Sequence, residues 1–240
     1  MKTICSKTGS DGNFSLISDG QSSIAIDCGI RWEKANKMSG YTLMDVCAVL
    51  SSHSHGDHGA FISQFIQHGL HTYATEETWC KEPISTAYKG VMHTLDGSQI
   101  TAGTFIVKPF KVPHTNSDGS PCENYGFLIY SKVTKEKMLW ITDCSYIENK
   151  FPPVDYICVE CNYIDVDDYS KELDYINPAV EKRRFSSHLS LNRCVDFIKK
   201  QDLSKVKFIK LLHLTKNQGI IEDEIKARFT KEFPEIEVIL

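Results

Sequence analysis

The stretch Ser51-Ser52-His53-Ser54-His55-Gly56-Asp57-His58-Gly59 follows directly on the apolar run Val46-Cys47-Ala48-Val49-Leu50. It places three imidazoles and one carboxylate within six positions, just after a predicted strand. Neutral imidazole and carboxylate are the ligand types that suit zinc and its first-row neighbours. A strand that ends in a tight turn can aim all four groups into one small volume. The stretch therefore predicts a metal site.

The composition is that of an ordinary globular protein. The chain has 240 residues, of which 41% are hydrophobic and 24% are charged, so one compact α/β domain over residues 1–240 is the simplest expectation. The N-terminal segment lacks the apolar core of a signal peptide, and no apolar run is long enough to span a bilayer. We therefore expect a cytoplasmic protein with no membrane partner. The nine scattered cysteines fit reduced, buried thiols, and Cys158 and Cys161 are expected to pack inside a strand rather than bind metal.

The formal net charge of −4 gives no overall basic excess of the kind that long nucleic acids attract. One basic cluster stands out, Lys182-Arg183-Arg184. Two interpretations stay open for it. It is either a solvated surface turn or a group of cations that grips phosphate.

Hydrophobic periodicity predicts an ordered succession of strands and helices. The predicted strands are 14–17, 23–27, 46–50, 104–110, 125–130, 138–142, 156–160, 207–212 and 237–240. The predicted helices are 32–38, 60–68, 76–81, 189–200 and 221–233.

Three further candidate ligands follow predicted strands. His114 comes shortly after the strand at 104–110, Asp143 follows 138–142, and His213 follows 207–212. When several strands of one sheet end in such groups, the ends meet at a common edge, and strands hold ligands more rigidly than loops do. The remaining histidines outside the predicted site are expected at the surface or at helix ends: His68, His71 and His93.

The order His-x-His-x-Asp-His, then an isolated His, an Asp at a strand end and a late His, resembles the metallo-β-lactamase superfamily over nearly the whole chain. The resemblance implies a four-layer αββα sandwich with two divalent metal ions, Zn²⁺ first and Mn²⁺ or Fe as alternatives. The implied ligands are His53, His55 and His114 for one ion, Asp57, His58 and His213 for the other, and Asp143 as a bridge. Many of the lactamases themselves carry a cysteine at the Asp143 position. Cys144 is expected to point away from the site and to be structural.

Five segments give a closer resemblance, to the YycJ/WalJ group, and a more distant one to tRNase Z. The segments are 8–14, 26–30, 159–163, 187–192 and 212–215. Members of that group are associated with nuclease activity on DNA, so the resemblance implies cleavage of phosphodiester bonds by a metal-activated hydroxide. Relatives commonly form dimers, which makes a homodimer an expectation of the same resemblance.

His188 separates phosphodiester cleavage from other metal-assisted hydrolysis. It precedes a predicted helix, so one interpretation is a helix-start residue that satisfies backbone donors. In the resembled nucleases the equivalent histidine is a catalytic acid or a phosphate contact, and an imidazolium can protonate a poor alkoxide leaving group. Glu160 would orient the ring. With Asp57 as proton acceptor, the predicted catalytic residues are Asp57, His188 and Glu160. Tyr163 or Tyr175 is a candidate for stacking on a base.

Three classes of function remain. The first is a nuclease acting on DNA or RNA. The second is a phosphodiesterase for a small nucleotide such as a cyclic mononucleotide, which needs no extended basic groove. The third is a thioester or lactam hydrolase, or a catalytically silent binding protein, and the complete ligand set argues against it.

Overall fold

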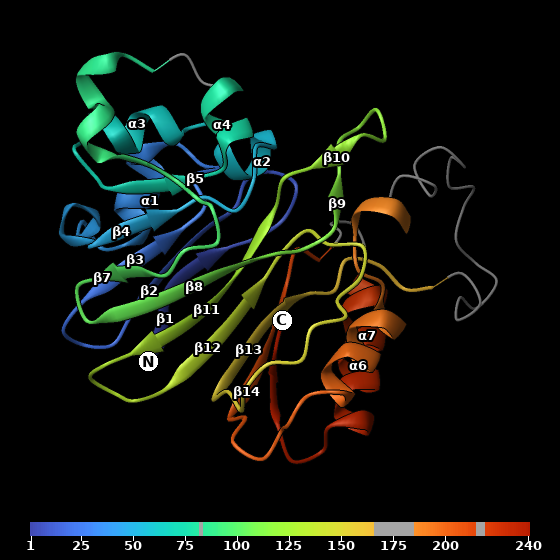
Figure 1. Ribbon diagram of the computed structural model, residues 1–240. Coiled ribbons are helices and arrows are strands. Elements are labelled where there is room, and N and C mark those ends of the chain that lie inside the picture. Colours follow the sequence, from blue (N-terminus) through green and yellow to red (C-terminus); the bar gives the residue numbers. More distant parts are fainter. Residues whose placement is uncertain (82–83, 166–184, 215–218) are drawn as a thin grey trace. The chain divides into compact units, whose positions relative to one another are not determined.

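The computed structural model describes residues 1–81, 84–165, 185–214 and 219–240 (Figure 1). Contacts within the chain define two compact units. Unit 1 comprises Met1–Lys111 and Glu123–Lys137, and unit 2 comprises Val112–Cys122 and Met138–Leu240. The expectation of one domain over residues 1–240 stays a prediction.

A six-stranded sheet forms one part of unit 1, with its strands in sequence order. The first three strands pair antiparallel and the later ones pair parallel, because the chain crosses back through helices between them. The strands are β1 (Lys2–Lys7), β2 (Phe14–Ser18), β3 (Ser23–Ile26), β4 (Ala48–Leu50), β5 (Thr72–Ala74) and β6 (Met92–Thr94).

Three more strands of unit 1 pair antiparallel: β7 (Ile100–Ala102), β8 (Phe105–Lys111) and β11 (Tyr125–Ser131). Asp19, in the turn after β2, joins this part of unit 1 to the six-stranded sheet. Its Oδ2 atom accepts hydrogen bonds from the hydroxyls of Thr104 and Ser131, both at 2.6 Å.

Short helices connect the strands of unit 1 (Figure 1), and they supply part of its core. Phe65 is fully buried, with Trp32 edge-on at 5.4 Å between ring centroids and Phe14 at 6.2 Å. Such aromatic pairs add to the free energy gained from burying apolar area. The helices are α1 (Trp32–Met38), η1 (Leu43–Asp45), α2 (Gly56–Gly59), α3 (Ile62–Gln67), α4 (Glu76–Lys81) and η2 (Thr86–Val91).

Unit 2 is built on parallel strands, in the order β12, β13, β14 and β15. Their bounds are Lys137–Ile141, Tyr156–Glu160, Phe208–Leu212 and Glu237–Ile239. Because the strands are parallel, the residues that follow β12, β13 and β14 emerge at the same edge. This places Asp143, Glu160 and His213 together, and it is the feature of unit 2 that positions its site.

Two helices and a small hairpin complete unit 2. The helices α6 (Leu191–Lys199) and α7 (Gly219–Glu232) lie side by side next to the parallel strands (Figure 1). The hairpin consists of β9 (His114–Thr115) and β10 (Pro121–Cys122). Across the four described ranges, no helix combines the length and apolar composition that a membrane crossing requires.

The predicted strands and helices correspond to observed ones, with differences at the bounds. The predicted helix 60–68 is wrong in extent, because Gly56–Gly59 already forms one turn and a break at residues 60–61 separates it from α3. Five paired segments were not predicted: β1, β5, β6, β7 and the β9–β10 hairpin. Most of them have only two or three residues, too few for a periodic signal. In β1 no residue is fully buried, so its apolar pattern is weak.

Candidate metal-binding and catalytic site

The predicted ligands of unit 1 lie in the turn that leaves β4. His53 and His58 are fully buried, whereas His55 and Asp57 are partly exposed. The His53 ring centroid lies 4.7 Å from that of His55 and 4.2 Å from that of His58. Nε2 of His58 lies 3.6 Å from Oδ2 of Asp57. Unit 1 therefore brings all four of its predicted ligands into one cluster.

Asp27 fixes the orientation of His58. The Nδ1 atom of His58 lies 2.8 Å from Oδ2 of Asp27, and the amide and hydroxyl of Ser52 both donate to Oδ1 at 2.8 Å. Asp27 is only 3% exposed and has a φ of 64°, a conformation that costs a non-glycine residue free energy. A carboxylate that accepts a hydrogen bond from Nδ1 leaves the lone pair on Nε2, which faces the donor amide of Asn13 and which a metal would take over.

The segment before β2 holds Asp57 from the other side. The backbone amide of Asn13 donates to the Asp57 carbonyl at 2.6 Å, and its side-chain amide lies 2.9 Å from Nε2 of His58. Gly29 packs so closely here that a Cβ atom would overlap the Asp57 carbonyl oxygen. Only glycine fits at this point of closest approach.

Glu77 of α4 anchors the middle of the histidine turn. Its Oε1 atom accepts from the Ser54 hydroxyl at 2.9 Å and from Nζ of Lys81 at 2.7 Å, and its Oε2 atom accepts from the Glu123 amide at 3.1 Å. Burial alone would raise the pKa of Glu77, but these donors lower it to about 2. The carboxylate is therefore charged throughout the neutral range and holds Ser54 in place.

Unit 2 has its own cluster at the edge where the parallel strands end. One ligand atom from each of Asp143, Glu160, His188 and His213 lies within 4.8 Å of the others. Asp143 and His213 have φ values of 48° and 55°. Left-handed conformations of non-glycine residues are concentrated at functional sites, where the surrounding structure compensates for the strain.

Glu160 is the centre of this cluster and is completely buried. Its Oε1 atom lies 2.6 Å from Nδ1 of His188 and 3.2 Å from Nδ1 of His213, and its Oε2 atom accepts from the Cys144 and Leu189 amides at 2.9 and 3.1 Å. A buried carboxylate with four donors is fully satisfied and rigid.

The pKa values of Glu160 and His188 shift in opposite directions. Burial alone would raise the pKa of Glu160, but the charge and hydrogen bond of His188 lower it. Burial alone would lower the pKa of His188, but the charge and hydrogen bond of Glu160 raise it. The geometry therefore favours an ion pair in which His188 carries two protons.

Ser190, and not His188, caps the N-terminus of α6. Ser190 is the N-cap residue, and its hydroxyl accepts a hydrogen bond from the Arg193 amide at 3.3 Å. This removes the helix-start interpretation of His188, whose side chain turns to Glu160 instead.

His114 stands on the β9–β10 hairpin of unit 2. Its Nδ1 atom lies 2.9 Å from the carbonyl oxygen of Ser187, and its ring centroid is 5.9 Å from that of His188. Because a carbonyl only accepts hydrogen bonds, Nδ1 carries the proton and Nε2 keeps its lone pair. The donor chemistry of His114, like that of His58, therefore fits a divalent metal ligand.

Cys144 and Tyr163 are both buried. Burial raises the pKa of the Cys144 thiol well above its ordinary value, so the thiol stays protonated. Tyr163 is 3% exposed, and its ring packs edge-on against Phe185 at 5.4 Å. A ring enclosed in this way has no face for a base, so the predicted stacking role of Tyr163 is not supported.

The predicted phosphate-binding residues Lys182, Arg183 and Arg184 lie outside the described residues, and so does Tyr175, the other stacking candidate. Three residues with no predicted role form hydrogen bonds with predicted ligands: Asp27, Asn13 and Asn162. The Asn162 side chain donates to the His213 carbonyl at 2.8 Å. All three stand in segments 8–14, 26–30 and 159–163, whose motif character was the available signal.

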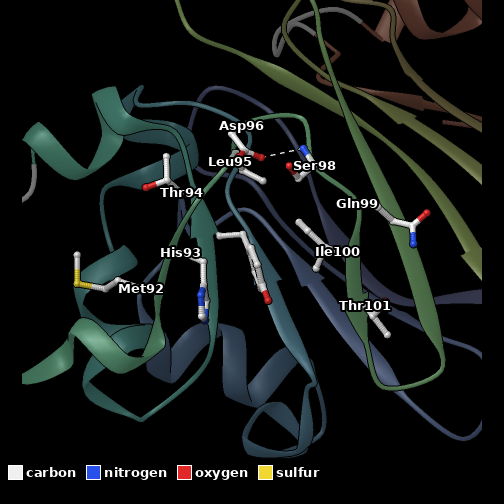
Figure 2. Close-up of a pocket in the computed structure, with 10 residues that line it drawn as sticks. Met92, His93, Thr94, Leu95, Asp96, Ser98, Gln99, Ile100 and Thr101 are labelled. Carbon is white, nitrogen blue, oxygen red and sulfur yellow. Dashed lines mark hydrogen bonds between the residues drawn. The ribbon is translucent and has the colours of Figure 1, made fainter.

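A cavity of about 460 Å³ in unit 1 involves none of the predicted ligands (Figure 2). Figure 2 shows His93 among its lining residues, and Nε2 of His93 lies 2.9 Å from Nδ1 of His71. The third histidine without a predicted site role, His68, ends α3 and stacks on Trp32 at 3.8 Å. His68 and His71 are exposed, as predicted, whereas His93 is half-buried in β6.

Comparisons with known proteins identify the family of the chain. Residues 23–209 match the family described as Beta-lactamase superfamily domain. No curated protein matches the chain in sequence.

Solved structures share the architecture at low sequence identity. YhfI from Bacillus subtilis, a metallo-beta-lactamase fold protein, is 19% identical with a TM-score of 0.69, over 99% of this chain and 95% of that chain. Human tRNase Z, short form, is 15% identical with a TM-score of 0.62, over 100% and 95%. Yeast PDE1 is 12% identical with a TM-score of 0.69, over 99% and 96%. At these identities the likeness concerns the fold alone.

Proposed function

The chain belongs to the beta-lactamase superfamily and has its α/β metallo-β-lactamase fold, as expected from the sequence, and on this premise we propose that it is a dinuclear metal-dependent phosphodiesterase. The finer proposal is a nuclease of the YycJ/WalJ kind. The mixed sheets and helices of the two units are consistent with the sandwich of that fold.

The proposed metal centre uses the ligands that the family resemblance implies. His53, His55 and His114 would hold one ion, Asp57, His58 and His213 the other, and Asp143 would bridge them. When bound, two divalent ions lower the pKa of a water molecule enough to supply hydroxide near neutral pH and neutralise charge that develops on phosphate. Zn²⁺ is the first candidate, and the same ligands also accept Mn²⁺ and Fe.

The pairing of His188 with Glu160 is the single observation that carries the choice of phosphodiester chemistry. Nδ1 of His188 lies 2.6 Å from a completely buried carboxylate, so the ring is held with Nε2 directed away from Glu160. Hydrolysis of a phosphodiester expels an alkoxide, which needs a proton as its bond to phosphorus breaks. A doubly protonated His188 is suited to give that proton from Nε2.

The remaining roles belong to residues of unit 1. Asp57 would accept the proton of the attacking water as its oxygen bonds to phosphorus. Asp27 would keep Nε2 of His58 available, and Asn13 would hold the Asp57 backbone. Glu160 acts on the reaction only through His188 and His213, so it is a positioning residue.

The proteins that share this fold support phosphodiester chemistry as the proposal, but they do not identify the substrate. They include tRNase Z and PDE1, which share the fold with this chain at 15% and 12% identity. A small-nucleotide phosphodiesterase is the second candidate, and the net charge of −4 favours it because long nucleic acids require a basic surface.

The test uses purified protein whose bound metal is quantified. The expected result is hydrolysis of bis-para-nitrophenyl phosphate that a chelator abolishes and that added Zn²⁺ or Mn²⁺ restores, with no hydrolysis of a chromogenic cephalosporin. DNA, RNA and cyclic mononucleotides then separate the two candidates. Cleavage of the cephalosporin without cleavage of any phosphodiester would overturn the proposal.

A further inference from the structure

A second cavity, of about 360 Å³, lies in unit 2 between the loop after β12 and one face of α6. Its loop side is formed by residues 146–148, and its helix side by Arg193, Asp196, Phe197 and Lys200. The helix residues recur at intervals of three and four, so they share one face of α6.

The same segments that carry the Asp143 and His188 cluster build this cavity. Tyr146 stands three positions after Asp143, and Arg193 stands five positions after His188. Nη1 of Arg193 donates to the Ser145 carbonyl at 2.8 Å and to the Phe185 carbonyl at 3.4 Å, so it ties the two segments together.

Tyr146 gives the cavity an aromatic surface, since this residue is 48% exposed. Arg193, across the cavity on α6, is exposed as well and carries a positive charge. An exposed ring next to a guanidinium is the combination that stacks a nucleobase and attracts a phosphate oxygen. Tyr146 is therefore a better candidate for stacking on a base than the buried Tyr163.

The charges around the cavity do not form a track for a polymer. Arg193 and Lys200 are balanced by Glu148 and Asp196, so the lining has no net charge at neutral pH. A track for a polymer needs an excess of cations that replaces counterions along many phosphates. The larger cavity of unit 1 is a poorer candidate, because the described residues that line it include Asp96 and no lysine or arginine (Figure 2).

We infer that this cavity is a nucleotide subsite, in which the base stacks on Tyr146 and a phosphate oxygen faces Arg193. The inference rests on the proposed phosphodiesterase function, and it adds that the substrate has a nucleobase on the side of unit 2 where Asp143 and His188 stand. Of the two candidates, it favours the small-nucleotide phosphodiesterase over the nuclease.

Equilibrium binding of adenosine monophosphate, measured by calorimetry on the metal-loaded protein, tests the subsite. Removing one base-stacking ring costs about 1–3 kcal/mol, so Tyr146→Ala is expected to weaken binding about tenfold. Tyr146→Phe keeps the ring and is expected to bind within about twofold of wild type. Tyr41→Ala is the matched control, because Tyr41 is 72% exposed and lies in unit 1.

Ribose phosphate, which has no base, is expected to bind the wild type and Tyr146→Ala equally. Equal affinity of wild type and Tyr146→Ala for adenosine monophosphate would overturn the subsite. Equal affinity of the wild type for the two ligands would do the same. Because these measurements need no turnover, they decide the subsite even if bis-para-nitrophenyl phosphate is not hydrolysed, which would count against the proposed function instead.

Discussion

Nδ1 of His188 lies 2.6 Å from Oε1 of Glu160, a carboxylate with no exposed surface. The same oxygen lies 3.2 Å from Nδ1 of His213, so one buried group orients a proposed acid and a proposed metal ligand. The two other donors to Glu160 are backbone amides, of Cys144 and Leu189. Glu160 therefore links the segments that follow β12 and β14 to the segment before α6.

Replacing Glu160 tests this link. Glu160→Gln keeps the size of the side chain but places an amide against imidazole N–H groups. We expect kcat for phosphodiester hydrolysis to fall about 10–100-fold, the range for residues that orient metal ligands and catalytic rings. Steady-state kinetics with quantified metal measures it. Glu33→Gln, at an exposed position of α1, is the control, and equal kcat values for both variants would contradict the positioning role.

Replacing Asp27, which orients His58, is expected to weaken metal binding. Asp27→Asn would turn an amide towards Nδ1 of His58 and would favour the tautomer with its proton on Nε2. We expect affinity for Zn²⁺ to fall about 10–100-fold, measured by competition with a chromogenic chelator. The exposed Asp45 supplies the control variant, Asp45→Asn. Unchanged affinity in Asp27→Asn would show that Asp27 does not orient His58.

A side chain at position 29 is expected to clash with the turn that contains Asp57. A methyl group at this position would overlap the Asp57 carbonyl oxygen, so Gly29→Ala must displace the turn. Overpacking of this kind typically costs about 1–3 kcal/mol of folding free energy, and metal binding is expected to weaken with it. Thermal unfolding and metal content measure both effects. Gly90→Ala, with nothing within 4 Å of the new atom, should match the wild type, and a Gly29→Ala protein that also matched would be inconsistent with the packing.

Asp19 gives a pH-dependent contribution to the stability of unit 1. Burial alone would raise its pKa, but the hydroxyls of Ser131 and Thr104 and nearby backbone amides lower it from 3.8 to about 2. A depressed carboxyl pKa stabilises the folded state above the unfolded pKa of 3.8, and the contribution is lost as the pH falls towards 2.

We expect Asp19→Asn to lower the free energy of unfolding by about 1 kcal/mol at pH ~7, with solvent screening taken into account. Urea unfolding at that pH and at pH ~3 measures the difference, which should shrink at the lower pH as the wild type loses its advantage. A difference that grew on acidification would contradict the assignment.

Much of the site could be predicted because metal-binding residue types follow directly on predicted strands. His53, Asp57 and His58 stand in one short run, and Asp143 and His213 each follow an apolar strand. Parallel pairing of β12, β13 and β14 then brings the strand ends of unit 2 together, so Asp143, Glu160 and His213 lie at one edge.

Other features depend on tertiary structure and left no local signal. The role of Asp27 rests on a left-handed φ and on contacts with residues 25 and 31 positions away. Tyr163 has an ordinary polar aromatic side chain in the sequence, but in the structure it is 3% exposed. The accessible tyrosine, Tyr146, could not be told apart from it by residue type alone.

His188 is proposed to protonate an alkoxide leaving group, and the loss of activity in His188→Ala should therefore depend on the leaving group. We expect a loss of about 100-fold or more on a dinucleotide that the wild type cleaves, because its alkoxide needs a proton. We expect a much smaller loss on bis-para-nitrophenyl phosphate, whose phenolate leaves unaided. Metal content equal to wild type is the control. Equal losses on both substrates, or full activity on the dinucleotide, would contradict this role of His188.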